Sequence, residues 1–312
     1  MLIIIDPEAN LVLITLLRRK HVIIVSRMKS DKAVSVKDPG DGNNVRTAVI
    51  TGGAGGLGRC FAESCARRGF DLILADLDAG RLMDAATRLR ADFGVGVQIL
   101  SGDLALQEVR DNLVDMAEES DSGIELWVNN AGISAKGPAS ETGSRKAMAV
   151  ASLNVLAFTD LAVRSIPLLQ RHSPGRMINV SSLGAFYPIP YMAAYASSKA
   201  YILHFSLALN RELARTGVTV SALCPGGMRT NELTIRDLDG QGFFGRLTIH
   251  SPEEVAEIAL NRSEAGAAVI IPGLWNQFLG FLGGFFPKIF LAGNLEKRWR
   301  RSLVSSGLMT GD

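Results

Sequence analysis

Cysteine, histidine and aromatic residues are scarce in this chain of 312 residues, and their spacing excludes several classes of protein. The three cysteines, Cys60, Cys65 and Cys224, form no C-x-x-C pair and no even set. They therefore predict free thiols in a reducing compartment instead of a disulfide framework. The four histidines are too widely scattered for metal-ligand spacing, so we expect no metal site.

An excess of charge of either sign is also absent. Lysine and arginine number 33 against 31 aspartates and glutamates, and this balance gives no overall field for an acidic partner such as nucleic acid. The start of the chain shows no secretory pattern, in which basic residues precede an apolar stretch and a cleavage site. These absences predict a cytoplasmic protein that binds no nucleic acid.

The first 28 residues contain no apolar run long enough to span a membrane, because charged residues interrupt every run. Three interpretations stay open for them: a loosely ordered extension, a start assigned upstream of the native one at Met28, or an amphipathic segment that anchors the chain at a surface. Residues 29–46 are polar and typical of a linker. We therefore treat residues 1–45 as an N-terminal extension and linker.

Strand-like apolar segments alternate with helical patterns from residue 46 onward, and a hydrophobic content of 47% is enough for a full-sized core. Strands that are buried on both faces and separated by helices favour a parallel sheet with right-handed crossovers. The fold class is thus α/β, with a single doubly wound parallel sheet of about seven strands over residues 46–272. The expected strands are Thr47–Thr51, Asp71–Ala75, Val97–Leu100, Ile124–Val128, Arg176–Val180, Val218–Leu223 and Ala267–Ile271.

A glycine-rich segment, T-G-G-A-G-G-L-G from Thr51 to Gly58, follows the first of these strands and precedes a helix. Backbone amides in such a position hold the pyrophosphate of a dinucleotide. The glycines fit three patterns: G-x-G-x-x-G, T-G-x-x-x-G-x-G and T-G-x-x-G-x-x-G. The loop alone predicts a dinucleotide site without selecting a family.

Asp76 ends the second strand, where an acid accepts hydrogen bonds from the adenosine ribose and repels a 2′-phosphate. This position favours NAD over NADP as the cofactor. Arg59 and Arg81 lie close enough in sequence to keep NADP as the alternative.

Three residues with complementary chemistry follow the fifth strand. Ser182 lies 13 residues before Tyr195, and Lys199 lies four after it, one helical turn along the same face. A ketone that accepts a hydride becomes an alkoxide that needs a proton, and tyrosine can exchange that proton. Positive charge on Lys199 favours the phenolate, and the Ser182 hydroxyl can hold the reacting oxygen.

From Arg46 to Thr230 the chain resembles the short-chain dehydrogenase/reductase family. The resemblance rests on N-N-A-G at Asn129–Gly132, on Ser182 with Y-x-x-x-K at Tyr195 and Lys199, and on P-G-x-x-x-T from Pro225 to Thr230. It implies a Rossmann-like fold and an NAD(P)-dependent oxidoreductase that interconverts a secondary alcohol and a ketone. The implied catalytic residues are Asn154, Ser182, Tyr195 and Lys199. The implied cofactor residues are Thr51, Gly52, Gly56, Leu57, Gly58, Asp76, Asp103, Leu104, Asn130, Ala131, Gly132, Tyr195, Lys199, Pro225, Gly226 and Thr230.

The substrate is less sharply indicated. Ser182, Tyr187 and Tyr191 are candidate substrate contacts, and residues 228–248 are expected to form a lid over the site. The segment Phe186–Pro190 contains no charged residue, and Phe243 and Phe244 lie in the expected lid, so we expect a hydrophobic substrate (steroid-like, acyl or polyketide). A catalytically idle nicotinamide-binding regulator and an epimerase-like enzyme are the alternatives.

Residues 273–312 form a tail that is first apolar and then basic. Glycines, Pro272 and Asn276 make it a poor candidate for a spanning helix. It could contact an anionic membrane surface peripherally, or cover a subunit partner or the substrate pocket. We also expect a homodimer or homotetramer.

Overall fold

A parallel seven-stranded sheet forms the centre of the computed structural model, which describes residues 2–6, 11–18, 21–25, 46–120, 123–228 and 248–305. The strand order is β10-β9-β8-β7-β4-β5-β6. The strands are β4 (Arg46–Thr51), β5 (Phe70–Asp76), β6 (Val97–Ser101), β7 (Ile124–Asn129), β8 (Gly175–Val180), β9 (Val218–Leu223) and β10 (Val269–Ile270). The α/β fold and all seven expected strands are confirmed.

The direction of winding reverses between β4 and β7. From β4 the chain proceeds outward through β5 and β6, and from β7 it proceeds the other way through β8, β9 and β10. The carboxyl ends of β4 and β7 therefore flank the crevice in which ligands of open α/β sheets bind.

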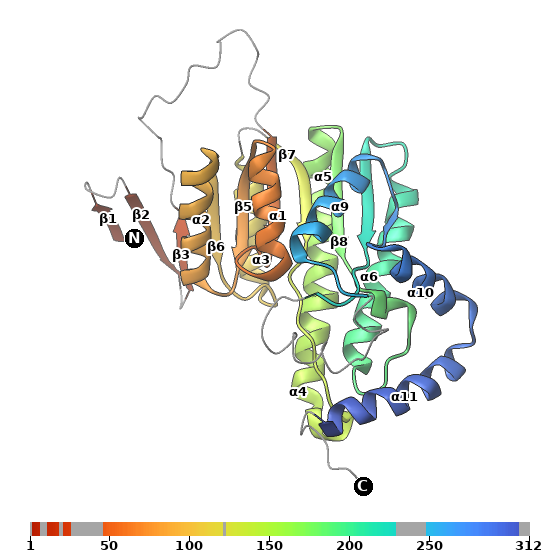
Figure 1. Ribbon diagram of the computed structural model, residues 1–312. Helices are drawn as coiled ribbons and strands as arrows, with labels where there is room; N and C mark the ends of the chain where they lie inside the picture. Colours follow the sequence, from red (N-terminus) through yellow and green to blue (C-terminus); the bar gives the residue numbers. More distant parts are fainter. Residues whose placement is uncertain are drawn as a thin grey trace.

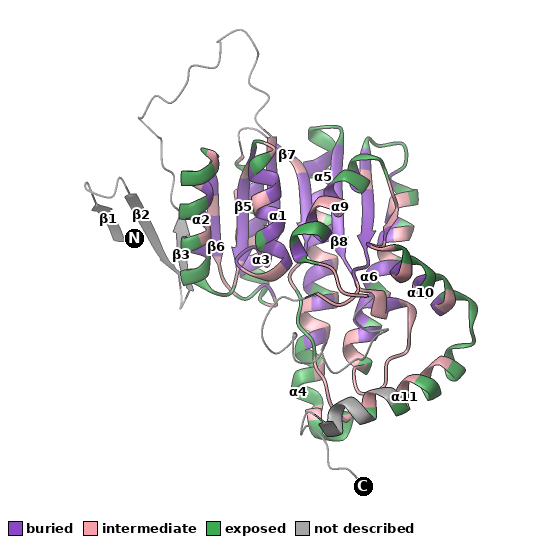
Figure 2. Ribbon diagram, viewed as in Figure 1, coloured by how far each residue is buried: buried purple, intermediate pink, exposed green. Residues whose placement is uncertain are grey.

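Helices cover both faces of the sheet, as Figure 1 shows. The core on one face joins Ala48 and Ile50 to helices α1 (Gly56–Arg67), α2 (Ala79–Phe93) and α9 (Pro252–Glu264). The core on the other face joins Val49 to α3 (Gln107–Glu118), α5 (Phe158–Arg171) and α6 (Ala193–Glu212). Successive strand residues point to opposite faces, so continuously apolar strands are buried on both sides (Figure 2).

One long helical segment crosses the second face. It comprises α4 (Ala139–Ala151), the π-helical turn η1 (Ser152–Ala157) and α5. Among the described residues, this Ala139–Arg171 segment has the length and hydropathy of a candidate membrane span. Its side chains Phe158, Leu161 and Leu169 pack into the core of the sheet, which explains the apolar composition.

The two ends of the chain contain regular structure that sequence reasoning did not predict. Strands β1 (Leu2–Asp6), β2 (Leu11–Arg18) and β3 (His21–Val25) form an antiparallel sheet. The tail contains two helices, α10 (Leu274–Phe285) and α11 (Lys288–Ser305). Gly273 is the N-cap of α10, and Pro287 lies between the two helices, so both helix-breaking residues stand at helix ends.

Candidate active site

The glycine loop between β4 and α1 needs glycine at three positions. Gly52 and Gly56 adopt the left-handed backbone conformation, with φ of +66° and +50°. A Cβ on Gly58 would lie 1.9 Å from the carbonyl oxygen of Gly52. At Gly55 the backbone is extended and a Cβ would meet only the Arg81 guanidinium, at 3.9 Å. The geometry thus favours the T-G-x-x-x-G-x-G pattern among the three that the sequence permits.

The first turn of α1 fits an anionic ligand. Gly55, its N-cap, supplies no side-chain hydrogen bond to the helix, and the first turn contains no acidic residue. The amides at this helix end are therefore free of a local carboxylate and coincide with the positive end of the helix dipole. A pyrophosphate suits this position.

Thr51 joins the glycine loop to the segment after β7. Its hydroxyl oxygen accepts hydrogen bonds from the amides of Asn130 (2.9 Å) and Ala131 (3.0 Å) and donates to the Val128 carbonyl (3.3 Å). The side-chain nitrogen of Asn130 (Nδ2) donates to the backbone carbonyls of Thr51 (2.9 Å) and Gly52 (3.1 Å). These bonds fix the two sides of the crevice to each other.

The far side of the crevice carries two acids. Asp76, at the end of β5, accepts hydrogen bonds from the amides of Ala54 (3.0 Å) and Asp78 (3.3 Å). Asp103, beyond β6, is exposed and accepts one from the Ala105 amide (2.9 Å), while Leu104 beside it is buried. The geometry therefore places Asp76 next to the glycine loop, as an adenosine-ribose ligand requires.

Tyr195 and Lys199 lie one turn apart on α6, and Ser182 follows β8. The Lys199 ammonium lies 5.9 Å from the centre of the Tyr195 ring and donates a hydrogen bond to the Val180 carbonyl (2.8 Å). Lys199 is buried and Tyr195 is partly buried. Burial lowers the pKa of Lys199 to about 8, and burial raises the pKa of Tyr195 while a hydrogen bond with Ser182 opposes that rise.

Asn154 lies in the π-helical turn η1 and is completely buried. Its side-chain amide exchanges two 2.9 Å hydrogen bonds with the backbone of Ile133 and donates a third to the Ser198 hydroxyl (3.0 Å). A Cβ on Gly132 would lie 3.2 Å from the Asn154 side-chain oxygen and 3.4 Å from the Lys199 ammonium nitrogen. Asn154 therefore lies between the N-N-A-G segment and α6. Single π-helical turns such as η1 are frequent at functional sites.

Tyr187 and Tyr191 hold the tail helices beside the site. The Tyr187 hydroxyl donates to the carbonyl of Leu279 in α10, and the Tyr191 hydroxyl donates to the carboxylate of Glu296 in α11 (2.8 Å). Both residues follow η2 (Leu183–Phe186), the short helix that Ser182 caps. Their hydroxyls are thus engaged by the tail, while their position after Ser182 keeps them candidates for the substrate mouth.

The nicotinamide end of the predicted site is partly described. The Pro225 carbonyl accepts a hydrogen bond from the Leu183 amide (2.8 Å), which ties this loop to the segment carrying Ser182. Thr230 and most of the expected lid, residues 229–247, lie outside the described residues. Cys224 is buried and its pKa is raised to about 12 by burial, so the thiol is not a nucleophile at neutral pH.

Comparison with known proteins gives this geometry a family. The family described as short chain dehydrogenase matches residues 46–237. The chain is 30% identical to 3beta-hydroxysteroid dehydrogenase 1 of Eggerthella lenta over 77% of this chain and 97% of that protein. The chain belongs to the short-chain dehydrogenase family.

Solved structures agree with that assignment. A short-chain dehydrogenase from Sphingobium yanoikuyae in complex with NADPH is 30% identical, with a TM-score of 0.66 over 77% of this chain and 94% of that one. A short-chain dehydrogenase/reductase from Burkholderia phymatum in complex with NAD is 26% identical, with a TM-score of 0.65 over 73% and 88%. This short-chain dehydrogenase is thus an oxidoreductase.

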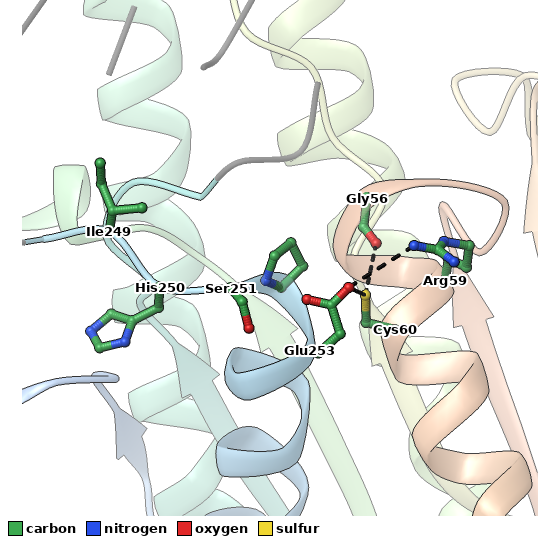
Figure 3. A pocket seen from close by; sticks show the side chains of 8 residues that line it. Gly56, Arg59, Cys60, Ile249, His250, Ser251 and Glu253 are labelled. Atoms are coloured by element: carbon green, nitrogen blue, oxygen red, sulfur yellow. Dashed lines mark hydrogen bonds and ion pairs between the residues drawn. The ribbon is translucent and has the colours of Figure 1, made fainter. Parts of the chain in front are cut away.

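A cavity of about 450 Å³ opens beside the glycine loop of the dehydrogenase (Figure 3). It is lined by Gly56, Arg59, Cys60, Ile249, His250, Ser251, Pro252 and Glu253.

Arg59 forms ion pairs with Glu63 (2.9 Å) and, more distantly, with Glu253 (4.0 Å). Arg81 pairs with Asp78 (3.3 Å). The two arginines nearest the adenosine side therefore already have acidic partners.

Sequence reasoning missed two groups of polar residues in the dehydrogenase. Behind the site, Asn129 donates to Asn179 (2.9 Å), which in turn donates to Ser206 (2.9 Å). In α10, Asn276 is fully buried and donates to the carbonyls of Pro272 (2.8 Å) and Thr248 (3.2 Å). A Cβ on Gly226 would lie 2.7 Å from the side-chain nitrogen of Asn276. No local sequence pattern indicates either set, because Asn129 is distant in the chain from Asn179, and Asn276 from Thr248.

Proposed function

We propose that this enzyme interconverts a bulky lipophilic secondary alcohol and the corresponding ketone, with NAD as the preferred cofactor and Tyr195 as the general acid and base. The cofactor class is NAD(P), and the glycine cradle, Asp76 and Lys199 are the residues that fit it. The observation that carries the proposal is the cluster of Ser182, Tyr195 and the buried Lys199 at the carboxyl end of β8, beside the buried Asn154.

Tyr195 exchanges the proton of the reacting oxygen. When bound, the nicotinamide supplies or accepts the hydride. In reduction, the Tyr195 hydroxyl gives its proton to the oxygen of the former ketone, and in oxidation the phenolate removes the proton of the alcohol. Ser182 donates to the same oxygen and holds it at Tyr195. Because burial raises the pKa of Tyr195, its phenol is protonated at neutral pH and is ready for reduction.

Lys199 and Asn154 prepare Tyr195 for the reverse direction. The buried ammonium of Lys199 lies under the Tyr195 ring and favours the phenolate in a medium that water screens poorly. Asn154 holds the Ile133 backbone and Ser198, which lies next to Lys199 on α6. In this proposal Asn154 is a positioning residue that keeps α6 and the N-N-A-G segment in register.

The decisive substitution is Tyr195→Phe, which removes the transferable proton and leaves the ring. We expect turnover to fall by roughly 10²- to 10⁴-fold while NADH binding stays close to that of the unmodified enzyme. Tyr201→Phe is the matched control, because Tyr201 lies on the same helix and its hydroxyl bonds Thr159 at the surface. Undiminished turnover in Tyr195→Phe sinks the proposed mechanism.

NAD preference is supported by Asp76 at the ribose position and by the acidic partners of Arg59 and Arg81. We expect kcat/KM to be higher with NADH than with NADPH. Asp76→Ala should narrow that ratio by about tenfold or more, because it removes both a ribose acceptor and a charge that repels the 2′-phosphate. A native enzyme that uses NADPH better refutes this part of the proposal.

The substrate class follows from the apolar segment Phe186–Pro190 and from the steroid named for the relative in Eggerthella lenta. A panel of steroid ketones, long acyl ketones and keto sugars, followed by NADH oxidation, tests it. Faster turnover of the keto sugars contradicts the lipophilic class. No turnover with any ketone favours the idle regulator instead.

In this proposal the enzyme is a cytoplasmic homodimer or homotetramer. Apolar side chains exposed on the helices of one sheet face support an oligomer, namely Met148, Leu156, Val163 and Tyr201. Sedimentation equilibrium of Leu156→Arg with Val163→Arg should show dissociation. An unchanged mass, or a monomeric native protein, contradicts this arrangement.

A further inference from the structure

Helix α10 buries its small residues and exposes its large apolar ones. The residues that it buries are Asn276, Gly280 and Gly283, spaced on one face. Its large apolar residues Leu274, Phe278, Phe281 and Phe285 recur at the spacing of the opposite face and are exposed. A surface helix of a soluble protein normally turns its large apolar side chains inward. In α10 the glycines allow close packing on the protein, and the phenylalanines point away from it.

The apolar surface continues into α11. Seven of the fourteen exposed large hydrophobic residues among the described part of the chain lie between residues 274 and 290. The most exposed of them are Ile289 (85%), Leu274 (84%), Phe285 (73%) and Phe281 (68%). Figure 2 shows exposed residues along both helices at one end of the molecule. A patch of this kind is a contact site in most proteins that carry one.

Positive charge borders this apolar surface. Residues 265–287 contain no charged residue, and residues 288–301 contain Lys288, Lys297, Arg298, Arg300 and Arg301 against the single acid Glu296. The Glu296 carboxylate already accepts a hydrogen bond from Tyr191. An apolar face beside a basic cluster is complementary to a bilayer that contains anionic lipid. A second copy of the chain would bring the same positive charge to the contact and be repelled.

The two helices are fixed to the rim of the active site. Gly283 of α10 packs so closely on Phe186 that a Cβ would lie 2.7 Å from the Phe186 Cβ. The Lys288 ammonium donates to the carbonyls of Phe186 (2.8 Å) and Gly283 (2.7 Å). Lys136, in the segment after β7, lies 5.5 Å from the ring of Trp299 in α11. Helix α11 thus runs from α10 back toward α4, beside the site (Figure 1).

We propose that the exposed face of α10 and α11 binds the surface of an anionic lipid bilayer, which brings the mouth of the active site next to the lipid. The helices lie on the bilayer without crossing it: α10 has 12 residues, too few to span the hydrocarbon core. The phenylalanines enter the boundary between headgroups and acyl chains, and the basic residues of α11 meet the headgroups. The docking does not depend on the identity of the substrate.

Sedimentation with vesicles tests the proposal on the full-length protein. Native protein should pellet with phosphatidylcholine vesicles that contain about 30% phosphatidylserine, and binding should weaken in high salt. The triple variant Phe281→Ser, Phe285→Ser, Ile289→Ser should lose at least about tenfold in partition coefficient. Lys297→Gln, which removes an exposed charge of α11, should lose about fivefold on anionic vesicles.

The matched control is Leu77→Ser with Leu106→Ser, which removes exposed apolar residues that follow β5 and β6, at the sheet edge opposite β10. It should pellet like the native protein. The triple variant should keep the thermal midpoint and the turnover of a water-soluble ketone, since its three residues lie outside the proposed chemistry. This second readout separates a failure of docking from a failure of the proposed function.

Two results overturn the proposal. One is equal recovery of native and triple-variant protein in the supernatant with anionic vesicles. The other is a native oligomer, measured by sedimentation equilibrium without lipid, that the triple variant dissociates, because the face would then bind a second copy of the chain.

Discussion

Lys199 is a cation buried with one backbone acceptor, and its environment makes a testable difference to stability. Burial lowers its pKa from 10.5 in the unfolded chain to about 8 in the folded one. Between these two values the unfolded chain binds more protons at this site than the folded protein does. The contribution of Lys199 to the free energy of unfolding therefore increases as the pH rises from about 8 to about 10.5, and it is constant below about 8.

We therefore expect the stability of the native protein relative to Lys199→Met to increase over that pH window. Methionine keeps the chain length and removes the charge. Urea unfolding of both proteins at several pH values between about 7 and about 10 measures the difference directly. A difference that is flat over this range would show that folding leaves the pKa of Lys199 unchanged. Activity should be lost in Lys199→Met at every pH.

Most of the candidate catalytic residues can be predicted from the sequence. Tyr195 and Lys199, for example, are one helical turn apart, so their spacing alone places them on the same face of a helix. The role of Asn276 could not be predicted from the sequence. Its neighbour Gly226 is distant in the chain, and an asparagine inside an apolar, glycine-rich stretch gives no local signal. The hydroxyl partners of Tyr187 and Tyr191 were missed for the same reason.

Among the elements of the fold, the glycine loop allows two alanine substitutions to be compared, one at Gly58 and one at Gly55. Gly58→Ala should shift the loop, because its Cβ would meet the Gly52 carbonyl at 1.9 Å, and backbone cannot move aside cheaply. We expect at least a tenfold loss of NADH affinity, together with a lower thermal midpoint. Gly55→Ala is the control, since its backbone is extended and the space is open. Titration of intrinsic fluorescence with NADH measures both. Equal affinities for the two variants would contradict the close approach at Gly58.

Elements of the sheet were predictable because buried parallel strands and their covering helices carry strong periodic patterns. The tail helices were not. Glycine has a low helix propensity, and α10 contains three glycines within Leu274–Phe285, with a fourth, Gly273, as its N-cap. Packing of Gly280 and Gly283 on Phe186 stabilises the helix in spite of that composition. Tertiary contacts of this kind cannot be read from a local window.

At the scale of the whole molecule, the sheet and its covering helices have a hydrophobic core of their own. All three hydrophobic clusters draw their members from residues between Ala48 and Ile271. A domain with its own core folds without its extensions. A chain that starts at Arg46 should therefore keep NADH affinity and keep its thermal midpoint to within about 3 °C. Calorimetry of the two chains checks this, and a clearly lower midpoint would assign residues 1–45 to the folded domain.

The order of the strands explains why the chemistry could be placed before any coordinates were known. Parallel strands end at one edge, so residues after β4, β7 and β8 meet there whatever their separation in sequence. The same rule does not reach the tail, which packs on the rim through contacts that no sheet topology dictates. The substrate class and the docking surface therefore depend most on side-chain packing.

Asn276 has a consequence of its own, since it joins the lipid-facing helix to the loop at the nicotinamide end. One face of α10 carries the exposed phenylalanines, and the other places Asn276 against Gly226. If a bilayer favours one arrangement of this helix, dinucleotide affinity changes by some factor, and thermodynamic reciprocity requires dinucleotide to change the affinity for lipid by the same factor. The occupancy of the dinucleotide site would then change how much of the enzyme resides on the membrane.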